Sequence, residues 1–201
     1  MQPKSHPTAN HPIIAVQQHE QRALYPIADQ RVSAGQTARP NAPVAVAYRL
    51  RSTCRMQTLE ALLRRFARRS HARWWVGKRP EVRDGRLAKA IAGQVGLPTS
   101  ADDPFAPGRM VFLSRADAAH VLAVAGTTSL AYGEPSPSTG PVRDAKAALN
   151  DLTSDATFLS NGHWKADAPS GWNRATSATF DCGVIGFDHE NAFIFWVEEE
   201  D

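Results

Sequence analysis

Two apolar, β-prone runs near the C-terminus constrain the fold more than any other part of the sequence. Residues 177–187 and 192–197 are separated by a polar linker, and four residues of this polarity suit a hairpin loop built around a type I turn. The second run alternates between two apolar sets, which are Phe193, Phe195 and Val197 on one face and Ile194 and Trp196 on the other. A strand that is apolar on both faces is normally central in its sheet or covered by helices. We therefore expect a sheet in which this strand is buried.

Apolar residues recur at helical spacing in four segments upstream of that hairpin. The segments are 59–66 with Thr58 as a cap, 84–96, 115–126 with Ser114 as a cap, and 142–152. Short strands are expected at 73–76, 109–113 and 156–159, and a further short stretch at 163–165 follows a turn at Gly162. Loops rich in Pro and Gly are expected at 98–108 and 133–141.

The first quarter of the chain has a different character. Prolines interrupt every potential helix in residues 1–55, and no strand-like alternation persists there. We expect 1–55 to be a disordered or weakly ordered tail and 56–201 to be a single compact α+β domain. This domain would hold three to four helices and a small, mainly antiparallel sheet that ends in the C-terminal hairpin. Met56 opens the first periodic segment, so an alternative is that the tail is not part of the native product.

The sequence favours a cytoplasmic protein. No stretch approaches the roughly 18 unbroken apolar residues of a membrane-spanning helix, and the N-terminus lacks the apolar core of a secretory signal. The two cysteines, Cys54 and Cys182, are too few for a disulfide scaffold, which agrees with a reducing compartment. Cys182 lies inside an expected strand, where a small apolar filler is the usual role.

Charge is distributed very unevenly along the chain. The formal net charge is +3, but residues 1–97 carry 17 basic and 5 acidic residues, while residues 98–201 carry 6 basic and 15 acidic residues. Such asymmetry predicts two electrostatic faces, or a polar tail beside a domain.

Motifs of high specificity are missing from the sequence. It contains no Walker-type phosphate loop, no Gly-x-Gly-x-x-Gly, no Gly-x-Ser-x-Gly and no His-Glu-x-x-His. The commonest nucleotide-binding, α/β-hydrolase and zinc-protease classes are therefore excluded, and we expect no cofactor and no bound metal. Whether the protein is an enzyme stays open, and the lack of a catalytic signature favours a negative answer.

The function that this profile favours is binding to another protein. A bacterial immunity or inhibitor protein that neutralises a toxin would be one instance, because an acidic surface with aromatic residues complements a basic partner. The candidate contact residues are Trp164, Trp172, Asp181, Asp188, Glu190, Glu198 and Glu199. Anchoring of a long loop on the core is the alternative explanation for the two tryptophans.

Two further functions remain as alternatives. The first is a hydrolase or nuclease, which would need an acid–base cluster drawn from Asp181, His189, Glu190 and His163 to converge on one cleft. The second is nucleic-acid binding through phosphate-pairing and stacking groups, which are Arg64, Arg65, Arg68, Arg69 and Trp74. The same arginine stripe also suits an anionic membrane surface, pairing with the acidic half of the chain, or simple solvation of a helix face.

Overall fold

The computed structural model describes residues 56–68, 71–101, 103–133, 136–165 and 171–200. The expected tail, residues 1–55, lies outside this part of the chain. The helices of the described residues are α2 (Gln57–Ala67), α3 (Asp84–Gly93), α4 (Arg115–Thr127), α5 (Thr139–Ala148) and the short 3-10 helix η1 (Leu149–Asp151). The strands are β1 (Ala72–Lys78), β2 (Val111–Leu113), β3 (Thr157–Ser160), β4 (Phe180–Phe187) and β5 (Asn191–Glu199).

The five strands form one sheet in the order β1-β5-β4-β3-β2, and every neighbouring pair is antiparallel. The α+β class, the four helices and the C-terminal hairpin are confirmed. β5 lies between β1 and β4, and residues 191–197 are all buried, as expected for a strand that is apolar on both faces. β1 and β2 are the two outer strands of the described sheet, and β2 contains only three residues.

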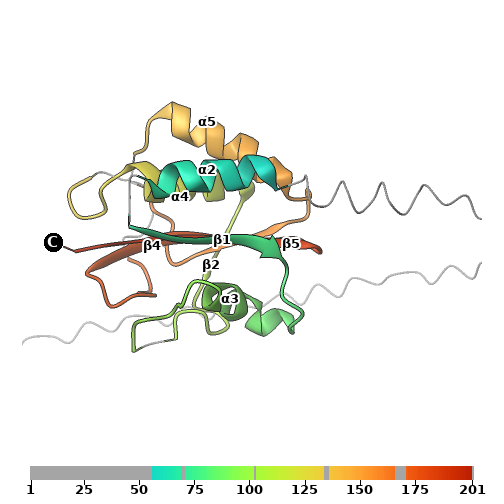
Figure 1. The fold of residues 1–201 in the computed structure, drawn as a ribbon. Coiled ribbons are helices and arrows are strands. Elements are labelled where there is room, and N and C mark those ends of the chain that lie inside the picture. The colour runs from blue at the N-terminus through green and yellow to red at the C-terminus, as the bar shows by residue number, and fades with distance from the viewer. Residues whose placement is uncertain (1–55, 69–70, 102, 134–135, 166–170, 201) are drawn as a thin grey trace, which may run out of the picture. The chain divides into compact units, whose positions relative to one another are not determined.

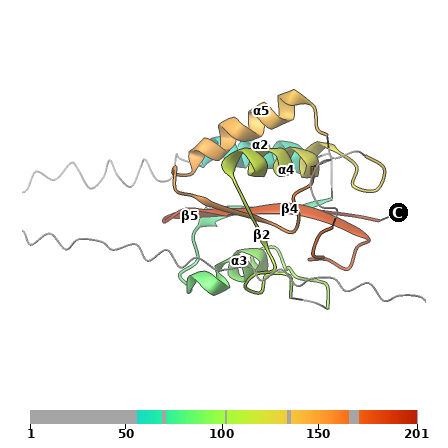
Figure 2. The same cartoon turned by 180° about the vertical axis from the view of Figure 1, so that it is seen from behind.

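The two faces of the sheet are covered unequally. Helices α2, α4 and α5 lie on one face, and α3 with the adjoining loop lies on the other (Figures 1 and 2). The core on the three-helix face is formed by α2, α4, α5 and side chains such as Phe193 and Phe195 of β5. The core on the α3 face contains Leu87, Ile91 and, from β5, Ile194 and Trp196. Burial of the two faces of β5 in two different cores is the direct result of its alternating apolar sequence.

The expected cap of the first helix is wrong. Thr58 lies within α2, and the N-cap residue is Met56, whose side chain makes no capping bond. The backbone N–H of Leu59 instead donates to the Asp151 carboxylate at 2.8 Å. A free N–H in the first turn of a helix can donate to any correctly placed carboxylate, so a residue 92 positions away supplies the acceptor that a local side chain does not.

Other boundaries were predicted with mixed success. Ser114 caps α4 as expected, because its hydroxyl oxygen accepts from the Asp117 N–H at 3.1 Å and donates to the Asp117 carboxylate at 2.7 Å. β1 continues through Gly77, and α5 begins at Thr139, inside the stretch expected to be a loop. Residues 163–165 do not form a strand. No helix in the described ranges is both long and apolar enough to cross a membrane.

Gly183 of β4 lies against β5 so closely that no side chain fits. A Cβ atom at this position would be 2.5 Å from the Phe195 carbonyl oxygen and closer still to the buried Trp196 ring. We predict that Gly183→Ala lowers the free energy of unfolding by about 1–3 kcal/mol, because neither the backbone nor the packed ring can give way cheaply. Urea denaturation followed by circular dichroism would measure the change.

Gly140→Ala in α5 is the matched control. A Cβ atom there has no neighbour within 4 Å, and alanine favours helix over glycine. We expect this variant to be neutral or stabilised by up to about 1 kcal/mol. Equal destabilisation by the two substitutions would contradict the close packing of β4 on β5.

Candidate functional site

The α3 face of the sheet is left open toward β2. Cross-strand register places Phe112, Leu159, Ile185 and Ile194 in one row, from β2 through β3 and β4 to β5. Partners in such a row lie on the same face of a sheet. Leu159, Ile185 and Ile194 are buried in the core on the α3 face, but Phe112, at the end of the row, is 75% exposed. The single helix on this face does not extend over the β2 end.

The uncovered end of this face is hollowed into a cleft of about 510 Å³, which we call the α3 cleft. It is lined by the first half of α3, the 105–110 segment, β2 and β3, and the turn at 187–189. Most of the lining is apolar, and Phe112, Met110 and Phe187 are prominent in it. A concave, mainly apolar site with a few polar groups at its edge is the usual form of a binding site.

Arg79 is the main cationic group of the α3 cleft. Its Nη2 donates to the Asp84 carboxylate at 2.5 Å, and its guanidinium lies 5.8 Å from the centre of the Phe187 ring. The Nε atom is buried and has no hydrogen-bond partner in the described part of the chain. Both Arg79 and Asp84 line the α3 cleft. The guanidinium is therefore oriented by a carboxylate and an aromatic ring, as in many arginine binding sites.

Asp188 lies beside the α3 cleft, and its carboxylate holds the turn between β4 and β5. It accepts hydrogen bonds from the backbone N–H groups of Glu190 at 2.9 Å, Asn191 at 2.7 Å and Thr153 at 3.1 Å. Burial raises the pKa of Asp188, but these three donors outweigh burial, and the pKa lies below its ordinary value of 3.8. Asp188 is only 5% exposed, so it shapes the cleft from within.

Asp181 is a buried anchor at the start of β4. Its carboxylate accepts from the N–H groups of Ala175 at 2.7 Å and Thr176 at 2.6 Å, and from the Asn161 side chain at 2.6 Å. Burial raises the pKa of Asp181, and the bonds from Thr176 and Ala175 oppose this rise. The residue has no exposed surface, so its carboxylate is out of reach of a partner in this structure.

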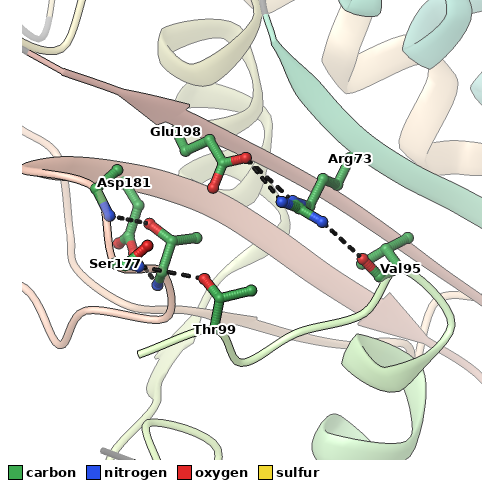
Figure 3. A network of polar contacts seen from close by, with 8 residues as sticks. Arg73, Val95, Thr99, Ser177, Asp181 and Glu198 are labelled. Atoms are coloured by element: carbon green, nitrogen blue, oxygen red, sulfur yellow. Dashed lines mark hydrogen bonds and ion pairs between the residues drawn. The ribbon is translucent and has the colours of Figure 1, made fainter. Parts of the chain in front are cut away.

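A second set of polar contacts joins strands β1 and β5 and the segment before β4 to residues beyond α3. Figure 3 shows Arg73 of β1 between the Glu198 carboxylate of β5 and the Val95 carbonyl beyond α3, and Ser177 donating to Thr99. The Arg73–Glu198 ion pair measures 3.0 Å. These contacts join β1, β5, the end of α3 and the segment before β4.

The expected acid–base quartet does not converge on one cleft. Asp181 is the second residue of β4, whereas His189 and Glu190 follow its last residue, roughly 25 Å further along the strand at about 3.3 Å per residue. His163 lies beyond β3 and is exposed. His189 and Glu190 are 3.6 Å apart on the exposed turn. Among the described residues, no three His, Cys, Asp or Glu side chains gather as a metal site.

Four of the five acidic residues proposed as a contact surface are bound within the fold, and the fifth, Glu190, lies on the exposed turn. Glu198 pairs with Arg73, and Glu199 accepts from the Ser129 hydroxyl and the Leu130 N–H, both at 2.6 Å. Together with the buried Asp181 and Asp188, these groups satisfy donors of the chain itself. Pairing between the basic and acidic halves, one of the expected uses of the arginines, is confirmed for Arg73–Glu198.

The two tryptophans pack on one another beside β4. The ring centres of Trp164 and Trp172 are 5.2 Å apart, and Trp172 stacks on Phe180 at 5.8 Å. Trp164 also donates through its indole N–H to the Asn161 side chain at 3.2 Å. Both rings are half-buried. These contacts favour anchoring of the loop over display of the rings to a partner.

The arginines of α2 do not form a free cationic stripe. Arg64 pairs with Glu60 and Arg65 with Asp144, each at 2.8 Å. Arg68 is exposed, and Arg69 lies outside the described residues. Trp74, expected to stack with these groups, packs against the core on the three-helix face.

Asp188 and His189 are the sequence-predicted site residues that line the α3 cleft, and sequence reasoning missed its apolar lining. Phe112 falls within an expected strand, and nothing in its local pattern distinguishes an exposed from a buried phenylalanine. Comparisons of the chain with protein-family models, with curated proteins and with solved structures found no match.

Asp188 provides a test of the site's electrostatic framework. We predict that Asp188→Asn lowers the free energy of unfolding at pH 7 by about 1–3 kcal/mol, because one of three backbone donors then faces an amide N–H. The folded-state pKa of Asp188 is depressed, so its stabilisation is complete above the ordinary value of 3.8 and is lost as the pH falls through the folded value. Denaturant titrations between pH 7 and pH 2 would follow the difference.

Glu190→Gln in the same turn is the control, since the bonds to Asp188 use only the Glu190 backbone. We expect a change within about 0.5 kcal/mol at pH 7. A wild-type advantage over Asp188→Asn that grew at low pH would contradict the assignment.

Proposed function

We propose that the protein is a non-catalytic protein-binding protein and that the α3 cleft is its contact surface. The observation that carries this proposal is the 75% exposure of Phe112 above an apolar cleft of about 510 Å³. Removing a phenylalanine side chain from water contributes about 1.5–3 kcal/mol of free energy. The exposed Phe112 therefore offers this free energy to a partner that covers it. Apolar anchors seated in pockets dominate the energy of most protein interfaces.

Of the five described carboxylates that suggested a basic partner, only Glu190 lies on an exposed turn, so the proposal does not rest on an acidic surface. Asp181 and Asp188 are buried, and Glu198 and Glu199 are engaged with the chain itself. We therefore retain protein binding, of which an immunity or inhibitor protein is one instance, without the acidic contact surface. The hydrolase and nucleic-acid alternatives are not retained, because the quartet is dispersed and Trp74 belongs to the core.

Site-specific photo-crosslinking in cells of the source organism would test the proposal. The photoreactive residue p-benzoyl-L-phenylalanine is placed at Phe112 or, as the matched control, at Tyr132, a side chain that is 81% exposed and does not line the α3 cleft. We expect a discrete protein adduct from position 112 and none from position 132. Mass spectrometry identifies the adduct, and the purified partner is then titrated against the full chain.

Gly85→Phe would block the cleft in that titration. A Cβ atom at Gly85 has no neighbour within 4 Å, so the added ring projects from α3 without displacing packed atoms. We expect at least a tenfold loss of affinity, from removal of about 1.4 kcal/mol or more of binding energy. Identical adducts from positions 112 and 132, or full affinity of Gly85→Phe, would overturn the proposal.

A further inference from the structure

The outer surface of α3 carries a row of cations beside the α3 cleft. Arg83, Arg86 and Lys89 are spaced three residues apart, so they lie close to one another along the helix, and all three are exposed. Lys89 pairs with Asp103 at 2.7 Å. The side chains of Arg83 and Arg86 have no ion-pair or hydrogen-bond partner in the described part of the chain.

The cations border the apolar site directly. Arg83, Arg86 and Lys89 line a second hollow, between α3 and the 103–107 segment. This second hollow and the α3 cleft share Gly85 and residues 105–107 as a common wall. A partner chain that fills the cleft and continues across this wall therefore meets the two unpaired arginines.

Three of the carboxylates nearby are bonded within the chain, and a fourth, Asp155, is exposed and lines the α3 cleft but not the second hollow. Asp84 is bonded to Arg79, Asp103 to Lys89, and Asp188 to three backbone N–H groups. Glu81 and Glu190 lie in a third hollow, which Arg83 also lines together with Lys78 and Arg79, and neither acid lines the second hollow. The charge left without a partner in the second hollow is thus positive.

We infer that the partner segment recognised by the α3 cleft is an acidic peptide, with a large apolar residue seated in the cleft and acidic residues facing Arg83 and Arg86. The inference rests on the proposed function and gives the partner the opposite charge to the one expected from the sequence. Exposed ion pairs contribute little energy each, so the cleft supplies most of the affinity and the arginines supply selectivity and a faster encounter.

A protein segment fits this surface better than a nucleic acid does. Strong binding to phosphates needs many cations, since each neutralised phosphate contributes separately. The second hollow offers three cations and one carboxylate. The adjoining cleft is lined mainly by apolar side chains, which suit a side chain such as phenylalanine or leucine.

Binding of synthetic heptapeptides to the full chain tests the inference. The first peptide has phenylalanine at its centre and three Glu or Asp residues on each side; the second replaces the phenylalanine with serine, and the third replaces the acids with lysine. Fluorescence anisotropy measures Kd at about 0.05 M and about 0.2 M salt. We expect the first peptide to bind most tightly, and to bind more weakly at the higher salt concentration.

Charge reversal on α3 is the decisive variant. The double variant Arg83→Glu with Arg86→Glu is expected to raise the Kd of the first peptide at least tenfold. Arg83 is the N-cap residue of α3, where an acid is compatible with the helix. The matched control is Arg143→Glu with Lys146→Glu, two exposed residues at the same spacing on α5, across the sheet from α3 (Figure 1). It is expected to leave Kd within about twofold.

Each contrary outcome has a distinct meaning. Equal binding of the acidic and lysine peptides that contain phenylalanine overturns the charge preference but leaves the apolar cleft as the contact surface. Equal binding of the phenylalanine and serine peptides overturns the role of the cleft and with it the proposed function. Tighter binding of a ten-nucleotide single-stranded DNA, lost in the α3 variant and not in the α5 variant, overturns the inference in favour of nucleic acid.

Discussion

The structure depends on one constraint, which is that β5 is apolar on both faces and must be buried on both. That requirement places β5 inside the sheet and calls for a layer of cover on each side. On one side α2, α4 and α5 supply this cover. On the other side α3 and its loop cover β5 and β4 but leave the β2 end open. The candidate site thus results from the unequal cover of the two faces of the sheet, and Phe112 lies where the layer formed by α3 and its loop ends.

Part of the strong charge asymmetry of the sequence is paired within the fold. Residues from the basic half and the acidic half pair across the fold, as in Arg65–Asp144 and Arg73–Glu198. Other acids satisfy backbone N–H groups far away in sequence, as Asp151 does at the start of α2. A carboxylate that bonds to its own chain has little left for a partner. The function of a polarised sequence is therefore better judged from the charges that have no ion-pair partner among the described residues, such as Arg83 and Arg86, than from the totals of its halves.

Much of the fold followed from the sequence, because periodicity reports which faces are buried. The alternation of Phe193–Val197 predicted the buried strand, and Ser114 with Asp117 predicted the start of α4. The misplaced cap at Thr58 and the dispersed acid–base quartet share one cause, since side-chain partners distant in sequence leave no local pattern. Asp181 shows a related limit: an aspartate inside a strand looked suited to binding, but its carboxylate is held by the Asn161 side chain and by the backbone N–H groups of Ala175 and Thr176, and backbone donors leave no residue pattern. The site escaped prediction for the same reason, because exposure of Phe112 depends on what fails to cover it.

The pairing of β1 with β5 has a consequence for how the chain is made. β1 has β5 as its sheet neighbour, and the Arg73–Glu198 contact closes a loop of 125 residues. At about 5–20 residues per second, a ribosome needs roughly 6–25 s to deliver β5 after β1 has been synthesised. During that interval β1 lacks its sheet partner, and Trp74 and Trp75, which pack on opposite faces of the finished sheet, lie on an unpaired strand. Formation of the complete sheet therefore waits until β5, which pairs with both β1 and β4, has been synthesised.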